Sequence, residues 1–143
     1  MTTAETHSQR ARRNLRQFVK FALVGGTGVI VNLAVFNATM CVWELAAGDR
    51  PLAAKYVANG LGFVVSVLTN YYLNRRWTFR SLGAVSTELP KFFTVSVIAY
   101  LANLGVFTLC LTQLGIGPNP SQLVAIAAVM PINFVANKLW SFR

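Results

Sequence analysis

The residues best suited to chemistry in this sequence are asparagines that stand directly before a cation. Asn74 precedes Arg75 and Asn137 precedes Lys138, and each asparagine has another asparagine four residues before it. An amide offers a donor and an acceptor without carrying charge, whereas an arginine or lysine side chain binds phosphate oxygens strongly. The pattern therefore predicts that a phosphate is held next to a polar, hydroxyl-bearing group.

Both sets lie in an eleven-residue stretch that occurs twice. Residues 70–80 read NYYLNRRWTFR and residues 133–143 read NFVANKLWSFR, with asparagine, tryptophan, phenylalanine and arginine in register. Each copy closes a long apolar run, and its tryptophan is typical of the depth at which a helix leaves the bilayer. A second match, between blocks beginning at Lys20 and Lys91, has a different offset. The agreement of two separate blocks predicts a duplicated membrane protein.

The composition requires long membrane-spanning helices to position these residues. Hydrophobic residues make up 55% of the chain and charged residues only 12%, about half the share that covers a soluble surface. Runs without charge cover 21–43, 56–74 and 92–137, and about 20 apolar residues cross a bilayer. The last run is divided by a Gly/Pro-rich turn at 115–121. We expect spans at about 20–42, 54–74, 92–114 and 121–139.

The placement of charge predicts that both termini are cytoplasmic. If the N-terminus lies inside, eleven of the 13 cations lie inside as well, and only Arg50 and Lys55 lie outside. We therefore expect an all-α integral membrane protein of two hairpins, related as parallel repeats about an axis along the membrane normal. Residues 17–143 would form this four-span domain, and residues 1–16 a disordered basic tail. Anionic lipids should favour the basic side, and so small a bundle predicts a homo-oligomer.

Five cations are expected at the cytoplasmic ends of the helices, and we name this group the basic collar. The collar comprises Lys20, Arg75, Arg76, Lys91 and Lys138. Such residues anchor the topology in any membrane protein. Arg75 and Lys138 directly follow asparagines expected to face inward, so we also interpret the collar as a binding site for a lipid phosphate.

Six asparagines are expected to face the interior of the bundle, and we name them the polar seam. They are Asn32, Asn70, Asn74, Asn103, Asn133 and Asn137. Polar side chains are costly in lipid, so these faces should turn inward. Two explanations remain open. The asparagines either hold the helices together, as the nearby Gly25 and Gly28 do by close packing, or they line a path for a polar head group.

Several classes of function are disfavoured by residues that the sequence lacks. Its only acids, Glu5, Glu44, Asp49 and Glu88, lie outside the expected spans, which disfavours proton-coupled exchange and a small-multidrug-type exporter. We find no catalytic carboxylate pair, no Ser/His/acid set and no metal-ligand spacing. We therefore expect no enzyme, no cofactor and no metal. The net charge of +9 follows the membrane topology, so no nucleic-acid partner is expected.

With these motifs in place, the sequence resembles the GtrA-like family of small four-span membrane proteins. The resemblance rests on Phe21 to Gly26 and on the duplicated motif at 70–80 and 133–143, and it covers about residues 17–143. It implies transfer of a polyprenyl-phosphate-linked monosaccharide across the bacterial inner membrane, for synthesis of cell-envelope polysaccharide. The alternative that it implies is a non-transporting scaffold that recruits a glycosyltransferase. The family supplies no catalytic residues.

Overall fold

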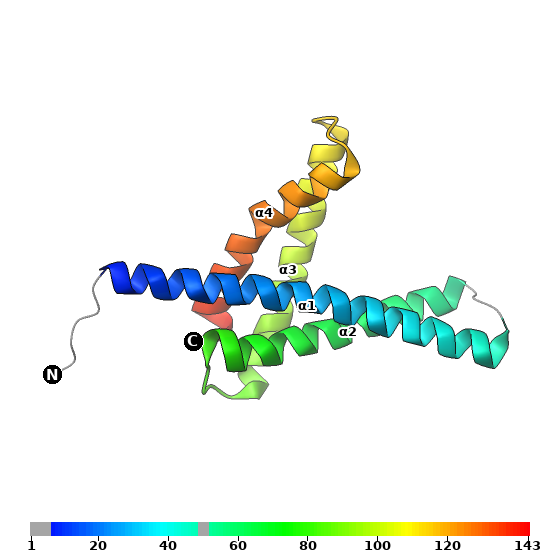
Figure 1. Ribbon diagram of the computed structural model, residues 1–143, viewed down its shortest axis with the longest axis horizontal. Helices are drawn as coiled ribbons and strands as arrows, with labels where there is room; N and C mark the ends of the chain where they lie inside the picture. The colour runs from blue at the N-terminus through cyan, green and yellow to red at the C-terminus, as the bar shows by residue number, and fades with distance from the viewer. Residues whose placement is uncertain (1–6, 49–51) are drawn as a thin grey trace. The chain divides into compact units, whose positions relative to one another are not determined.

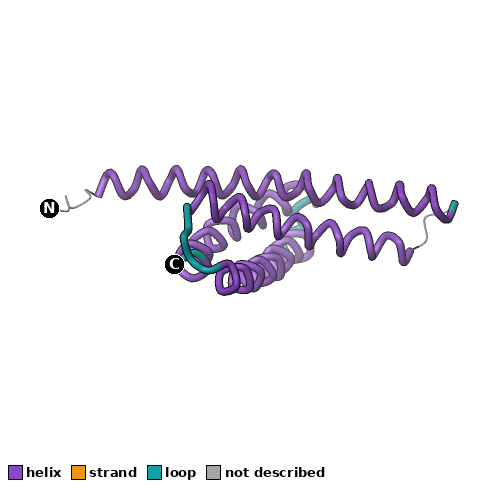
Figure 2. The backbone as a smooth tube through the Cα atoms, turned by 90° about the horizontal axis from the view of Figure 1, so that it is seen from below, coloured by secondary structure: helices purple, strands orange, loops and turns teal. Residues whose placement is uncertain are grey.

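The computed structural model describes residues 7–48 and 52–143, which leaves Arg50 outside the described residues. Four α-helices follow one another, α1 (His7–Ala47), α2 (Leu52–Leu73), α3 (Val85–Thr112) and α4 (Pro118–Ala136) (Figure 1). A short π-helix extends α2 as η1 (Asn74–Phe79) and another extends α4 as η2 (Asn137–Ser141). Within the described part of the chain every regular element is a helix (Figure 2). The all-α prediction is confirmed.

Three helices are long and apolar enough to cross a membrane. They are α1, α3 and the segment Pro120–Ser141, which runs through α4 into η2. Large apolar side chains cover their exposed faces, including Ile30 at 68% exposed and Ile98 at 60%. Helix α2 covers the expected second span. The chain is therefore multi-pass, and the fourth crossing and the orientation stay predictions.

The N-terminal segment differs from the sequence prediction. Residues 7–16, expected to be part of a disordered tail, form the first turns of α1. Arginine, alanine, glutamine and leucine are good helix formers, and a helix that already exists is extended without a new nucleation step. The exposed side chains of these residues explain why composition alone indicated disorder.

The first hairpin is one of two compact units, residues 19–78. Helices α1 and α2 run alongside each other in opposite directions (Figures 1 and 2). At one end Met40 packs against Ala54 and Ala58, whose small side chains permit close approach. Near the middle, Gly62 lies so close to α1 that a Cβ would be 2.9 Å from the backbone oxygen of Asn32.

The other unit comprises residues 7–18 and 79–143, and it contains the second hairpin. Helix α3 packs against both α4 and η2. Aromatic rings gather at the η2 end of this hairpin. The ring of Phe79 stacks on that of Phe142 with 4.7 Å between centroids, and the centroid of the Phe92 ring lies 5.7 Å from that of Phe142. Each unit thus contains one hairpin, and the first turns of α1 belong to the unit of the second hairpin.

Topology is tested by reporter fusions placed after residues 48, 84 and 117. We expect them to report outside, inside and outside, because the collar cations hold both ends of each hairpin at the cytoplasmic face. Alkaline phosphatase and green fluorescent protein give opposite signals at each site and serve as paired controls. Any other order would contradict the four-span topology.

Candidate functional site

The duplicated motif ends each hairpin in the same unusual backbone. Asn74 begins η1 and its repeat equivalent, Asn137, begins η2. In η2 the Phe142 amide donates to the carbonyl of Asn137, five residues earlier, at 3.0 Å. π-Helical turns are rare and frequently mark functional positions. The sequence repeat is therefore also a repeat in backbone geometry, a feature that residue types alone did not predict.

Polar side chains in these π-helical ends are buried. Asn74 is 2% exposed and Thr78 4%, and their equivalents Asn137 and Ser141 are 0% and 1% exposed. Within the described residues, the buried side-chain atoms that lack a hydrogen-bond partner are oxygens of Asn70, Asn74, Thr78, Asn137 and Ser141. An unsatisfied buried polar group costs about 1–3 kcal/mol. Such a concentration calls for a functional explanation.

In the first hairpin, one collar lysine is tied to the motif tryptophan. The Lys20 ammonium donates to the Trp77 carbonyl oxygen at 3.3 Å and lies 5.0 Å from the centre of the indole ring. This contact places Lys20 beside η1, which carries Arg75 and Arg76. The arginine at 76 is exposed and the one at 75 is half-buried. Three collar cations of this unit therefore gather at one end of the hairpin.

In the second hairpin, Lys138 is held by the N-terminal segment of the chain. Its ammonium donates to Oδ1 of Asn14 at 2.5 Å and to Oε1 of Gln17 at 2.7 Å. It also lies 5.6 Å from the ring centre of Phe134, the residue that Phe18 meets edge to face. An ammonium has three donors, so two are used by amides that carry no charge. A phosphate would be the stronger acceptor.

The remaining collar residue, Lys91, belongs to the same end of the second hairpin. It is half-buried on α3, next to Phe92, whose ring lies against Phe142 just beyond η2. The structure thus gathers the collar cations of each hairpin at the end that carries its π-helix. That the collar binds phosphate stays a prediction.

In the first hairpin the seam asparagines lie where α1 meets α2. The Asn32 side chain lies against Gly62, and Asn70 lies against Gly28, where an added Cβ would be 2.7 Å from Oδ1 of Asn70. Ser66 donates to the Gly28 carbonyl at 2.9 Å in the same crossing. These contacts favour a packing role for Asn32, one of the two explanations left open by the sequence.

In the second hairpin the seam asparagines differ in their surroundings. Nδ2 of Asn137 donates to the Asn133 carbonyl at 3.0 Å and to Oδ1 of Asn133 at 2.8 Å. This pairing fixes the direction of the Asn137 amide and leaves its Oδ1 turned away. Asn103 is half-buried on α3, and no glycine crossing like that of Asn32 surrounds it.

The two deeper asparagines should therefore respond differently to substitution by leucine. We expect Asn32→Leu to lower the thermal stability of the purified protein, because the Asn32 side chain fills the contact with Gly62. We expect Asn103→Leu to leave stability nearly unchanged but to slow movement of substrate. Unfolding temperature and transport rate measured on the same preparations test this. Equal losses of both quantities in both variants would contradict a passage role.

Three features of the site were missed from the sequence. Thr78 and Ser141 recur in register within the duplicated motif, so the repeat itself was the available signal. The contacts of Lys138 with the N-terminal segment carry no local signal. Glu88, assigned to a loop, lies in the first turn of α3, is 2% exposed and accepts a hydrogen bond from Ser81. A carboxylate suits the N-terminus of a helix.

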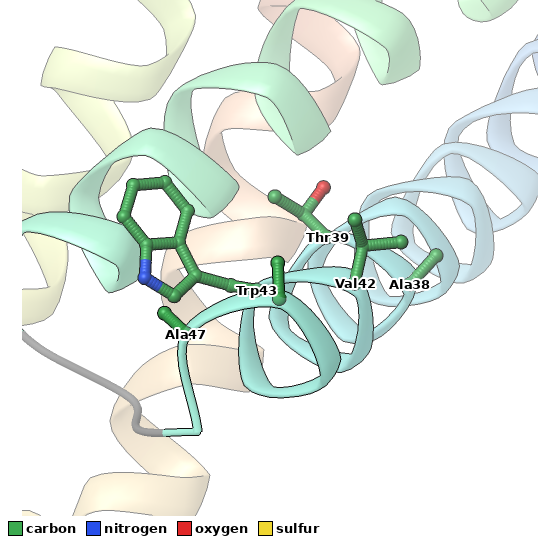
Figure 3. Close-up of a pocket in the computed structure, with 6 residues that line it drawn as sticks. Ala38, Thr39, Val42, Trp43 and Ala47 are labelled. Carbon is green, nitrogen blue, oxygen red and sulfur yellow. The ribbon is translucent and has the colours of Figure 1, made fainter.

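A hollow lies beside the last turns of α1. It is lined by Ala38, Thr39, Val42, Trp43, Ala46 and Ala47, all on α1 (Figure 3). The Thr39 hydroxyl already donates to the Val35 carbonyl at 2.8 Å, so the lining offers an apolar surface without charge. Among the described residues, no group of three His, Cys, Asp or Glu side chains is placed to hold a metal.

Comparison with known proteins identifies a family and several relatives of this chain. A family model described as "GtrA/DPMS, transmembrane domain" matches residues 20–142. The chain is 24% identical over 134 residues to a "Cell wall teichoic acid glycosylation protein GtcA" of Listeria innocua, covering 91% of this chain and 87% of that protein. It is 24% identical over 127 residues to an "Uncharacterized membrane protein YwcD" of Bacillus subtilis, covering 86% and 94%.

A longer relative matches through part of its length. The chain is 27% identical over 124 residues to a "Dolichol-phosphate mannosyltransferase" of Pyrococcus furiosus, covering 85% of this chain but 32% of that protein. In that archaeal protein, the matching segment is thus one part of a longer polypeptide.

Proposed function

The chain belongs to the GtrA/DPMS transmembrane domain family, and from this premise we propose that it moves a polyprenyl-phosphate-linked monosaccharide across the bacterial inner membrane. The transferred sugar would serve the synthesis of cell-envelope polysaccharide. Relatives named for teichoic acid glycosylation support a role in the glycosylation of cell-wall polymers. Translocation is the more specific part of this proposal, and the chemistry of the two hairpin ends supports it.

The observation that carries the proposal is the repeated pairing of a buried asparagine with a cation. Asn74 and Asn137 are buried at the start of their π-helices, and Arg75 and Lys138 follow them directly. A phosphate-linked sugar has one anionic group beside several hydroxyls. The cations match the phosphate and the amides match the hydroxyls, so one motif contains partners for both parts of the head group.

The prenyl chain places little demand on the protein. It is apolar and can remain in the lipid while the head group crosses, so only the phosphate and the sugar need polar partners. The exposed faces of the helices are covered by large apolar side chains, as contact with lipid requires. The polar seam would then supply neutral hydrogen-bonding groups along the route without placing a charge in hydrocarbon.

A second candidate function is that of a scaffold that recruits a glycosyltransferase. The partial match to a longer protein named as a mannosyltransferase favours it, because there the matching segment is joined to further sequence. In this chain a separate enzyme would have to dock. Exposed arginines on the first turns of α1, among them Arg10, Arg12 and Arg16, offer a surface for an acidic partner.

The two functions are separated by giving the purified protein a substrate but no enzyme. Proteoliposomes with a labelled glycosyl polyprenyl phosphate should show protein-dependent exposure of the sugar on the opposite leaflet. Liposomes with heat-denatured protein serve as the control. Wild-type exposure equal to that control, together with co-purification of a glycosyltransferase, would favour the scaffold and contradict translocation.

A further inference from the structure

Resting on the proposed function, we infer that each π-helical end recognises hydroxyl groups of a sugar, whereas the collar cations beside that end recognise its phosphate. The residues assigned to the hydroxyls are Asn74 and Thr78 in η1 and Asn137 and Ser141 in η2. The two hydroxyl residues are sites that the asparagine pattern alone did not indicate.

The first support is the location of the unsatisfied oxygens. Among the side chains that the structure describes, every buried nitrogen or oxygen without a hydrogen-bond partner lies in a copy of the duplicated motif. Four of the unsatisfied oxygens belong to equivalent residues of the two copies, the asparagines at 74 and 137 and the hydroxyl residues at 78 and 141. Two independent occurrences of one pattern indicate a common requirement rather than a local packing defect.

The second support is the behaviour of the other hydroxyls in this chain. In the α-helical segments, six serine and threonine side chains donate to a backbone carbonyl three or four residues earlier, at 2.7–2.9 Å. They are Thr27, Thr39, Thr69, Thr94, Ser96 and Thr112. Thr78 and Ser141 make no such bond. Their hydroxyls are therefore left available, in contrast to those of the α-helical segments.

The π-helical backbone gives Ser141 surroundings that differ from those of the other hydroxyls. The carbonyl one α-helical turn before Ser141 belongs to Asn137, and in η2 that carbonyl accepts from the Phe142 amide at 3.0 Å. In an α-helix the same carbonyl would accept from the Ser141 amide itself, so the bond pattern around the serine is not that of an α-helical turn. The equivalent threonine lies in η1, which has the same backbone class.

The hydrogen-bonding properties of the unsatisfied atoms indicate that they bind the sugar rather than the phosphate. An amide oxygen only accepts hydrogen bonds, and a hydroxyl both donates and accepts. A phosphodiester has no proton to donate to an amide oxygen, whereas each sugar hydroxyl donates one and accepts others. At each end, the asparagine and the hydroxyl residue therefore match a polyol, and the neighbouring cations match the phosphate.

The described state is closed to such a ligand. The oxygens have almost no exposed surface, so the sugar reaches them only when a π-helical end opens. An internal water molecule has the same donor capacity and fits a closed site. Sugar and water differ in a way that can be measured, because only a sugar makes affinity depend on the head group of the lipid.

The test compares lipid carriers with and without a sugar. The variant is Thr78→Val with Ser141→Ala, which removes both hydroxyls and little volume. The matched control is Thr69→Val with Ser96→Ala, whose hydroxyls are bonded to the backbone. The probes are undecaprenyl phosphate and its glucosyl, galactosyl and arabinosyl esters, with affinity and unfolding temperature measured on full-length protein in detergent.

We expect wild type and control to prefer at least one ester over the bare carrier. In the variant, the ratio of the affinity for the preferred ester to the affinity for undecaprenyl phosphate should fall about fivefold for each hydroxyl removed, as for a neutral hydrogen bond. The affinity for undecaprenyl phosphate itself should not change. Its unfolding temperature should not fall, because the deleted groups have no partner. An undiminished preference, or a fall in unfolding temperature with equal loss for every probe, would overturn the inference in favour of buried water. If wild type binds none of the probes, the proposed function itself fails.

Discussion

Replacing Arg75 and Lys138 together by glutamine is expected to weaken binding of a polyprenyl phosphate about tenfold or more at each hairpin end. A charge-assisted hydrogen bond contributes about 1.5–3 kcal/mol, and each 1.4 kcal/mol is about a factor of ten in affinity. Arg75→Gln alone should therefore cost about tenfold or more. Glutamine keeps a polar side chain at both positions, so the helix ends retain donors while they lose charge.

The control for this variant removes the same charge from another cytoplasmic position. Arg10 and Arg12 are exposed on the first turns of α1, and changing both to glutamine should leave the affinity nearly unaltered. Dissociation constants at two salt concentrations provide the measurement, since binding by the collar weakens as salt screens it. Equal affinities for wild type and the Arg75/Lys138 variant would mean that the collar only anchors the topology.

Substitution of Gly62 by leucine is expected to lower the free energy of unfolding by about 3 kcal/mol. A Cβ at this position would lie 2.9 Å from the backbone oxygen of Asn32. A backbone atom cannot move aside without displacing α1, so the two helices must separate. Because the same crossing includes Asn70 and Gly28, we also expect η1 to lose its fixed position and transport to fail.

Gly60 provides the matched control on the same helix. It is exposed, and an added Cβ would meet nothing within 4 Å. Gly60→Leu should therefore leave the unfolding temperature unchanged or raise it, because leucine is the better helix former. Unfolding in detergent, followed by tryptophan fluorescence, compares the pair directly. Similar stabilities for the two variants would contradict the close crossing of α1 and α2.

The sequence was sufficient to predict the helices and the duplication. Apolar runs have a length set by the bilayer, and the motif at 70–80 recurs at 133–143 because each copy ends a hairpin. Residue spacing also indicated that Asn32 and Asn70 face inward. It could not identify their partners, because the contacts with Gly62 and Gly28 join residues about thirty to forty positions apart.

Other features depend on long-range packing or on backbone geometry. The residues in η1 and η2 have ordinary helical preferences, and a π-turn differs from an α-turn only by the residue to which each amide donates. The N-terminal segment was interpreted as disordered because it is polar. Its order is accompanied by hydrogen bonds between Lys138 and both Asn14 and Gln17, more than 120 positions away in the chain.

The central claim, that this chain by itself moves a lipid-linked sugar between leaflets, is tested most directly by a single time course. Purified protein is reconstituted with several copies in each vesicle, and a glycosyl undecaprenyl phosphate is present in both leaflets. Periodate that cannot enter the vesicles is then added to oxidise the exposed sugar. We expect oxidation to pass the outer-leaflet half and to approach completion in vesicles with wild-type protein, and to do so more slowly with the Arg75/Lys138 variant. Oxidation that stops at one half in wild-type vesicles, as in protein-free ones, would contradict this claim.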